Sequence, residues 1–178
     1  FVGARFTVKG PLITPRPPQG QVVVLAPDVL DADSRADIVL VRQPDLASVA
    51  ARAEAARQAG APLVFAEVEV VLDAGAPAAE RLARLDESTL WPPSGRLRHV
   101  GSAAGLTALL RQLAGVVDGV RLHPAVLAVD LPVLTGQVLP ALAADGLHRP
   151  PRAGDTLRTT LGLARPTNRF AAAATTNA

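Results

Sequence analysis

The 178 residues contain no cysteine, no methionine and no tyrosine, and only 3% of them are aromatic. Without cysteine the chain can form neither a disulfide framework nor a cysteine-rich metal site. Proline, arginine, aspartate or glycine interrupts every apolar run, so no segment approaches the roughly 18 apolar residues of a membrane span. The first residues also lack the charged and then apolar segments of an export signal. We therefore expect a cytoplasmic protein with no membrane partner, although Phe1 is not an initiator methionine and leaves room for an upstream region.

Lysine is nearly absent as well, since Lys9 is the only one among 18 basic residues. Almost no side chain loses a proton between the pKa of histidine and that of arginine. The net charge of +2 therefore persists to high pH, and the isoelectric point is near 10.3. The positive charge lies at the two ends: residues 1–20 and 151–178 each carry +3, and the 130 residues between them carry −4. A nucleic-acid groove would gather basic and stacking aromatic side chains on one folded surface. The composition therefore argues against a nucleic-acid partner.

Apolar material is abundant, with 49% hydrophobic residues and a mean hydropathy of +0.26. This is enough for a buried core, and the length fits one ordinary domain. Four short, continuous apolar runs predict strands that are buried on both faces, as strands of parallel sheets are. These runs are Val22–Ala26, Asp37–Val41, Leu63–Leu72 and Val116–Leu122.

Helical segments alternate with these runs. The clearest is Leu46–Ala59, which has Asp45 as a good N-cap and Gly60 as a good stop. Prolines predict a loop over Ser88–Arg98, which holds the only tryptophan. The remaining predicted helices are Pro77–Leu85, a helix through Leu113 that Ser102 caps, and Leu131–Ala144 with a kink near Gly136 or Pro140.

Strands that alternate with helices predict an α/β fold with a parallel sheet and right-handed crossovers. Four buried parallel strands leave two open sheet edges, a problem that a closed (β/α)8 barrel solves. Such a barrel needs about 200–250 residues or more, so this chain has room for half of one. We divide the chain into a proline-rich arm at residues 1–20, a half barrel at 21–148 and a C-terminal tail at 149–178.

Both ends of the chain carry a family resemblance. The segment Phe6–Leu12, followed by Pro15–Gly20 and a strand, resembles the luciferase-like flavin-dependent monooxygenases, in particular the nitrilotriacetate and alkanesulfonate monooxygenase branch. Further segments resemble that family in the same order over nearly the whole chain: Val100–Ser102, Val117–Leu122, Val138–Leu142 with Gly146 and Leu147, Thr156–Arg158, Leu161–Leu163 and Arg165–Arg169.

The resemblance implies a specific fold and activity. Members of the family are flavin-dependent (β/α)8 barrels about twice this long, so the chain would correspond to their C-terminal half, strands five to eight. The implied cofactor is FMN, reduced and used as a co-substrate, or a deazaflavin. The implied partners are a missing N-terminal half barrel or a second copy of the chain, together with a flavin reductase. Reduced flavin and oxygen would oxidise a small organic substrate.

The sequence departs from the family where relatives hold the flavin phosphate. Many relatives follow the first of these strands with Gln-Ala-Gly, a serine and a glycine, whereas this chain has Leu25–Leu30 there. Pro27 removes an N–H donor, and Asp28 and Asp31 place negative charge where a phosphate would lie. A tyrosine common in the tail of relatives is missing, and Phe1 lies about where many relatives carry a histidine.

Candidate site residues follow from the rule that barrel enzymes work at the carboxyl ends of their strands. His123 is the candidate catalytic residue, since an imidazole there could hydrogen-bond a flavin or move a proton, and the alternative is packing beside Pro124. The candidate cofactor-binding residues are Ala26 and Asp28 after the first strand, Arg42 after the second and Ser102 at a helix start. For Arg42 the alternative is a surface pair with Asp45, and for Ser102 it is N-capping alone.

Two features of the sequence allow more than one interpretation. Glu67 and Glu69 lie on one face of the third strand, either as an acid/base or metal pair or as carboxylates paired with a neighbour such as Arg121. Burying both unpaired would be costly, which favours the structural interpretation, and we predict no metal site. Trp91 is either part of a lid over the substrate or an anchor that pins its loop.

Two functions therefore remain open at this point. The first is the C-terminal half of a flavin-dependent monooxygenase, which would be inactive without its N-terminal half. The second is a non-catalytic, degenerate half barrel that serves as an assembly module, and the altered phosphate loop motivates it. In either case exposed strand edges and an open inner face predict self-association.

Overall fold

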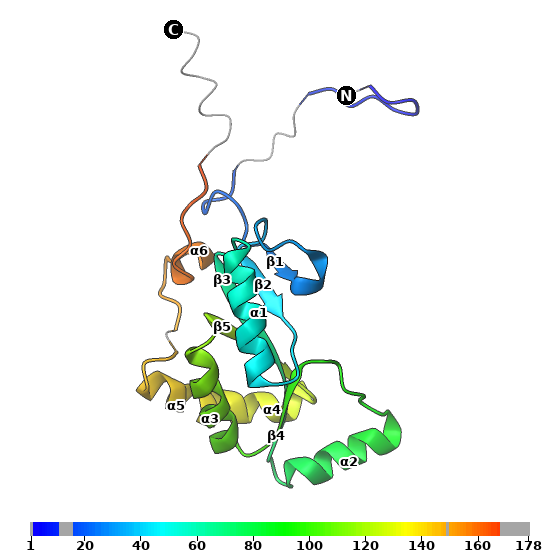
Figure 1. The fold of residues 1–178 in the computed structure, drawn as a ribbon, viewed down its shortest axis with the longest axis vertical. Coiled ribbons are helices and arrows are strands. Elements are labelled where there is room, and N and C mark those ends of the chain that lie inside the picture. The colour runs from blue at the N-terminus through cyan, green and yellow to red at the C-terminus, as the bar shows by residue number, and fades with distance from the viewer. Residues whose placement is uncertain (1, 11–15, 149, 168–178) are drawn as a thin grey trace. The chain divides into compact units, whose positions relative to one another are not determined.

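A computed structural model describes residues 2–10, 16–148 and 150–167 of the chain (Figure 1). It divides into two compact units. The larger unit is Val23–Ala153 and contains the sheet with its helices. The smaller unit combines the two ends of the chain, Phe1–Val22 and Gly154–Ala178.

The larger unit is built on a five-stranded, entirely parallel sheet, which confirms the predicted α/β class. The longest strand, β3, pairs with β2 on one side and β5 on the other, and β1 extends the sheet beyond β2. The strands are β1 (Leu25–Pro27), β2 (Ile38–Val41), β3 (Leu63–Leu72), β4 (Leu97–Gly101) and β5 (Gly119–Pro124).

The strand β4 was not expected from the sequence, which placed these residues at the end of a loop. It pairs with the last part of β3, on the same side of β3 as β2: β2 ends opposite Ala66, and β4 begins opposite Val68. Its sequence Leu-Arg-His-Val-Gly shows no apolar run because only Leu97 enters the core. Charged partners on β3, described below, hold Arg98 in the strand instead of leaving it to water.

Two strand positions also shift from the predicted ones. The first strand begins at Leu25 and not at Val22. The last begins at Gly119, because the N–H groups of Val116 and Val117 donate to the carbonyl of Leu113 and close the preceding helix. These two valines are apolar because they lie at a helix end beside the core, not in a strand.

The helices follow the strands as predicted and cover one face of the sheet. The helix α1 (Leu46–Gln58) contacts β2 and β3 (Figure 1). Its N-cap is Asp45, whose carboxylate accepts from the N–H and the hydroxyl of Ser48, and these bonds lower the pKa of that carboxyl. The others are α2 (Ala78–Ser88), α3 (Ala103–Ala114), α4 (Leu127–Val133), α5 (Leu139–Ala144) and the single 3-10 turn η1 (Asp28–Leu30).

The alternation of β3 divides its side chains between two environments. Alternate residues from Val64 to Leu72 belong to the hydrophobic core, together with residues of α1 and α3. The residues between them, among them Phe65, Glu67 and Glu69, face the opposite side of the sheet. In a closed barrel the helices lie outside, so this opposite side corresponds to the barrel interior.

The helical stretch from Leu127 to Ala144 contains a π-helical segment, η2 (Leu134–Val138), where the sequence predicted a kink. The N–H of Leu139 donates to the carbonyl of Leu134, five residues back. The ring of Pro140 would clash with the carbonyl of residue 136 in a regular α-helix, and the wider turn relieves this. Buried side chains recur at every fourth position, at Asp130, Leu134, Val138 and Leu142.

The same stretch bears on the expectation of no membrane segment. Within the described residues Leu127–Ala144 is a helix long and apolar enough to cross a membrane by length and composition alone, with a mean hydropathy of 1.5. Its Leu134, Val138 and Leu142 belong to the hydrophobic core, and its Asp130 is fully buried. These contacts make it one of the helices that cover the sheet.

A buried ion pair connects the carboxyl end of β3 to two helices. One oxygen of Asp130 accepts from Arg81 at 2.7 Å and from the N–H of Leu72 at 3.1 Å, and the other accepts from the N–H of Val126 at 2.9 Å. Arg81 also donates to the carbonyl of Leu72. Every oxygen of this fully buried carboxylate therefore has a donor, which is what makes its burial tolerable.

In the smaller unit, two arginines of one segment or the other donate to backbone carbonyls of the opposite segment. Arg158, in the short helix α6 (Leu157–Thr160), donates to the carbonyl of Gln21 at 2.8 Å. Arg16 donates to the carbonyl of Pro166. A single antiparallel bridge pairs Val2 with Thr7 near the start of the chain.

Replacing Asp130 by alanine is expected to destabilise the protein by about 3–5 kcal/mol, because Arg81 would remain buried without its partner. Urea unfolding of the wild type and the variant measures this difference. The control is Asp145→Ala, which removes the partner of Arg111 in a surface pair and should change stability little. Equal effects of the two substitutions would contradict the account.

Candidate functional site

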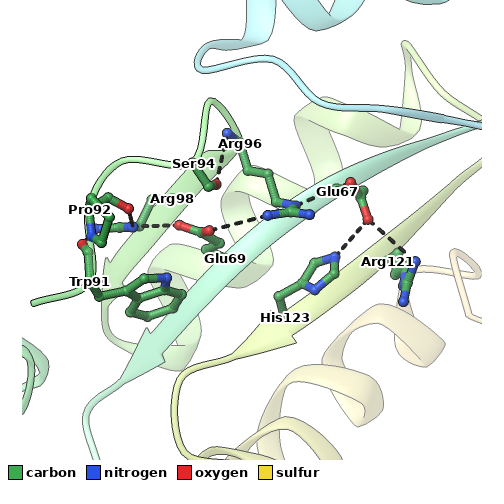
Figure 2. Close-up of polar contacts among 9 residues, drawn as sticks. All are labelled: Glu67, Glu69, Trp91, Pro92, Ser94, Arg96, Arg98, Arg121 and His123. Carbon is green, nitrogen blue, oxygen red and sulfur yellow. Dashed lines mark hydrogen bonds and ion pairs between the residues drawn. The ribbon is translucent and has the colours of Figure 1, made fainter. Parts of the chain in front are cut away.

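A cluster of charged side chains lies on the sheet face opposite the helices (Figure 2). The strands β3, β4 and β5 bring it together by their register, since Glu67 is paired with Arg121, and Glu69 with both Arg98 and His123. Arg96, which precedes β4, completes the cluster. The cluster lies beyond the level at which β2 ends, toward the carboxyl end of the sheet. Barrel enzymes carry their active sites at this end.

Glu67 is the central acceptor and is only 5% exposed. Its Oε1 accepts from His123 Nε2 at 2.9 Å and lies 3.4 Å from an Arg121 nitrogen, while its Oε2 accepts from Arg96 Nε at 3.1 Å. The expected pairing of this residue with Arg121 is therefore present. Three donors on one buried carboxylate offset the loss of its hydration.

Glu69, which is 2% exposed, has two arginines as its ion-pair partners in the described part of the chain. Its Oε2 accepts from Arg98 Nε at 2.7 Å, and its Oε1 lies 3.7 Å from Arg96. Arg98 also donates to the carbonyls of Trp91 and Pro92, at 3.2 and 3.0 Å, and its guanidinium lies 4.4 Å from the centre of the indole ring. Trp91 is thus fastened to the sheet, which favours the anchor interpretation of its loop.

The cluster has an excess of positive charge. Two carboxylates face three guanidinium groups, so the formal sum is +1 with a neutral imidazole. Arg121 is the least engaged, since its side chain is 53% exposed and makes one long contact. Among the described residues no group of three histidine, cysteine or acidic side chains could hold a metal ion.

His123 lies at the predicted place, near the carboxyl end of β5. The expected alternative was packing beside Pro124, but the ring instead hydrogen-bonds the buried Glu67. Its side chain is 27% exposed, so a ligand in the barrel interior can reach it. Its catalytic role stays a prediction.

The predicted phosphate loop after β1 does not fit a phosphate. Ala26 is buried in the strand and Pro27 offers no N–H. The mostly buried carboxylate of Asp28 lies 3.3 Å from Arg52, and this guanidinium also binds Asp33 at 3.0 Å. Two carboxylates share one cation, which leaves a net negative charge that repels a dianion.

The other two candidate cofactor residues occupy separate positions. Arg42 is exposed directly after β2, and Asp45 caps α1 instead of pairing with it. Ser102 is the N-cap of α3, where its hydroxyl accepts from the N–H of Gly105 at 3.1 Å. Across the described residues no hydrogen bond or ion pair joins Ala26, Asp28, Arg42 or Ser102 to the Glu67 cluster.

A cavity of about 400 Å³ lies beside the end of β5. Its walls are mostly apolar and include Leu90 and Trp91 from the anchored loop, Leu85 from α2, and Pro124 with Ala125. Leu90 is among the exposed large hydrophobic residues. An organic ligand could bind there by apolar contact.

Sequence reasoning missed Arg96 and Arg98, and it missed the contact between Glu67 and His123. One signal could have found them: polar residues two positions apart occur in three segments, at Glu67 and Glu69, at Arg96 and Arg98, and at Arg121 and His123. Spacing of two on a strand places both side chains on one face. The register that makes these pairs meet is visible only in the sheet.

Known proteins with this fold were found by structure alone. No protein-family model and no curated protein matches the sequence. The EDTA monooxygenase from Chelativorans sp. BNC1 matches 93% of this chain at a TM-score of 0.67 and 19% identity, and the match covers 56% of that protein. The fold is that of one half of a luciferase-like flavin-dependent monooxygenase.

Two further solved structures agree with this half-barrel assignment. A long-chain alkane monooxygenase matches 91% of this chain and 50% of its own length, at a TM-score of 0.65 and 18% identity. A riboflavin lyase, solved with modified FMN and riboflavin, matches 96% of this chain and 54% of its own length, at a TM-score of 0.67 and 17% identity. The chain thus spans about half the length of the proteins it matches.

Replacing Arg98 by alanine is expected to release the Trp91 loop, since the cation over the ring and two carbonyl hydrogen bonds are lost together. Trp91 is the only tryptophan, so its emission should move to longer wavelength as water reaches the ring. Fluorescence of the native protein measures this. Arg84→Ala, which removes an exposed arginine of α2, is the control and should leave the emission unchanged.

Proposed function

We propose that this chain is the C-terminal half of a flavin-dependent monooxygenase, which uses reduced flavin and oxygen to oxidise a small organic substrate. The observation that carries the proposal is the half-length match: 93% of this chain lies on 56% of an EDTA monooxygenase. The sheet itself supports it, because β1 and β5 each pair with only one strand in the described part of the chain. Both edges would be paired in a closed barrel.

The partner that best fits these edges is an N-terminal half barrel, and a second copy of the chain is the other candidate. A groove of about 490 Å³ runs beside β5 between α3 and α5. Its walls are mixed, and six apolar side chains in them could pack against a further strand and helix: Leu110, Val120, Leu122, Leu139, Leu142 and Leu147. We place the complete protein in the cytoplasm, where a flavin reductase would supply reduced flavin.

The cofactor we propose is FMN or a deazaflavin, bound toward the carboxyl end of the sheet. Bound reduced flavin supplies the activation of oxygen, and the protein supplies position and charge. Since the loop after β1 does not fit a phosphate, we assign the phosphate contacts of this half to Arg42 and to the start of α3 at Ser102. His123 is our candidate for a group that touches the flavin or the substrate.

One observation favours a second candidate, a non-catalytic half barrel that acts as an assembly module. The carboxylates of Asp28, directly after β1, and of Asp33 both pair with Arg52. If a chain no longer needed to bind a phosphate, it could acquire acidic side chains on this arginine without any loss of function. The fold and the open edges would persist as an interaction surface.

Flavin titration separates the two candidates. FMN fluorescence is followed as the purified chain is added, alone and together with the polypeptide encoded upstream of it. Stoichiometric binding at micromolar concentration supports the enzyme. Arg42→Gln should weaken it about tenfold, while Arg35→Gln, which removes another exposed arginine, should not. Absence of binding in both mixtures would favour the assembly module.

The open edges also predict that the isolated chain self-associates. Size-exclusion chromatography with light scattering should show a dimer or larger species, because unpaired N–H and carbonyl groups at β1 and β5 recruit other strands. A well-folded monomer over a range of concentrations would contradict this, and would mean that the edges are covered.

A further inference from the structure

We propose that Glu67 is a positioning residue for His123, holding the ring so that one nitrogen is left to accept a proton in the barrel interior. The two side chains come from neighbouring strands, Glu67 from β3 and His123 from β5, and point toward each other across the sheet face (Figure 2). Their use in a reaction rests on the function proposed above. The pairing itself is a property of this chain and can be measured without flavin.

The hydrogen bond fixes which ring nitrogen carries the proton. An ionised carboxylate only accepts, so the 2.9 Å contact requires His123 Nε2 to donate to Glu67. In the neutral ring Nδ1 is then the free acceptor. A ligand with an O–H or N–H group can give its proton to Nδ1, which leaves the ligand as its conjugate base and the ring as imidazolium. The carboxylate stabilises that cation, as in other carboxylate–histidine pairs.

The surroundings hold Glu67 in this orientation. Its second oxygen accepts from Arg96 Nε at 3.1 Å, so the carboxylate cannot turn away without losing a partly buried ion pair. Glu67 is 5% exposed, whereas the His123 side chain is 27% exposed. A ligand can therefore reach the ring, while the carboxylate that orients it stays buried. A ring whose orientation is set by a buried acceptor needs less reorganisation when a ligand binds.

Other charged groups of the cluster act on the same ring. Glu69 on β3 lies opposite His123 in the strand register, but its carboxylate pairs with Arg98 and Arg96. Arg121 on β5 shares Oε1 of Glu67 with the ring. Arg121 and the His123 ring therefore contact the same oxygen of one carboxylate. Glu69 is a built-in comparison, because it lies on the same strand and face, is equally buried and pairs with arginines instead of histidine.

The experiment is an NMR pH titration of the three histidine rings, with the His123 signals assigned from His123→Gln. In Glu67→Gln the midpoint of the His123 titration should fall to lower pH, because Arg96 and Arg121 remain beside the ring without the carboxylate. In Glu69→Gln the midpoint should move much less, although thermal stability falls in both variants. A purely structural role for Glu67 predicts no such difference.

Arg121→Gln provides a test in the opposite direction and removes a half-exposed side chain, so folding should be preserved. Loss of this cation should move the His123 midpoint to higher pH. Equal shifts in Glu67→Gln and Glu69→Gln, or a downward shift in Arg121→Gln, would overturn the proposal while leaving flavin binding untouched. Conversely, absence of flavin binding with the expected ring titrations would reject the monooxygenase and keep the positioning role.

Discussion

Two carboxylates buried in the middle of β3 need cationic partners, and this need organises much of the sheet. Glu67 and Glu69 are almost removed from solvent, on the face opposite the one that the described helices cover. Their partners come from the neighbouring strand β5 and from β4 with the residue before it. The ion pairs therefore stabilise the packing of β4 and β5 against β3, as apolar contacts stabilise the helix-covered face. A charged face of this kind is also able to orient a ligand, which an apolar interior is not.

The incomplete sheet gives the second constraint. A parallel sheet is stable when its faces are covered and its edges are paired, and here the outer edges of β1 and β5 lack a described strand. The match to about half the length of the similar solved structures agrees with the proposal of a second half. The loop after β1, where Arg52 binds Asp28 and Asp33, does not have the charge of a phosphate site. The fold thus matches the similar solved structures, whereas the charges at this loop do not suit a flavin phosphate.

Much of the fold could be predicted because its signals are local. The apolar run Leu63–Leu72 is a strand with the predicted bounds, and Asp45 and Gly60 enclose α1 because capping depends on neighbouring residues. The strand β4 was missed because its polar side chains are stabilised by residues 29 positions away in sequence. The contact between Glu67 and His123 was missed for the same reason: it depends on which strands are neighbours and on their register, and neither is encoded locally.

The π-helical segment before α5 keeps both halves of this helical stretch facing the core. Each residue of an α-helix turns the chain by about 100°, so a buried stripe with a spacing of four would rotate about 120° between Asp130 and Leu142. The segment Leu134–Val138 absorbs that rotation, and all four side chains of the stripe stay against the core. Deleting one residue there would restore regular winding and leave Asp130 and Leu142 eleven residues apart, which is three turns and about 20°, so both would still face the core. The extra residue in the π-helical segment therefore changes the length of the helix but not the facing of its two halves.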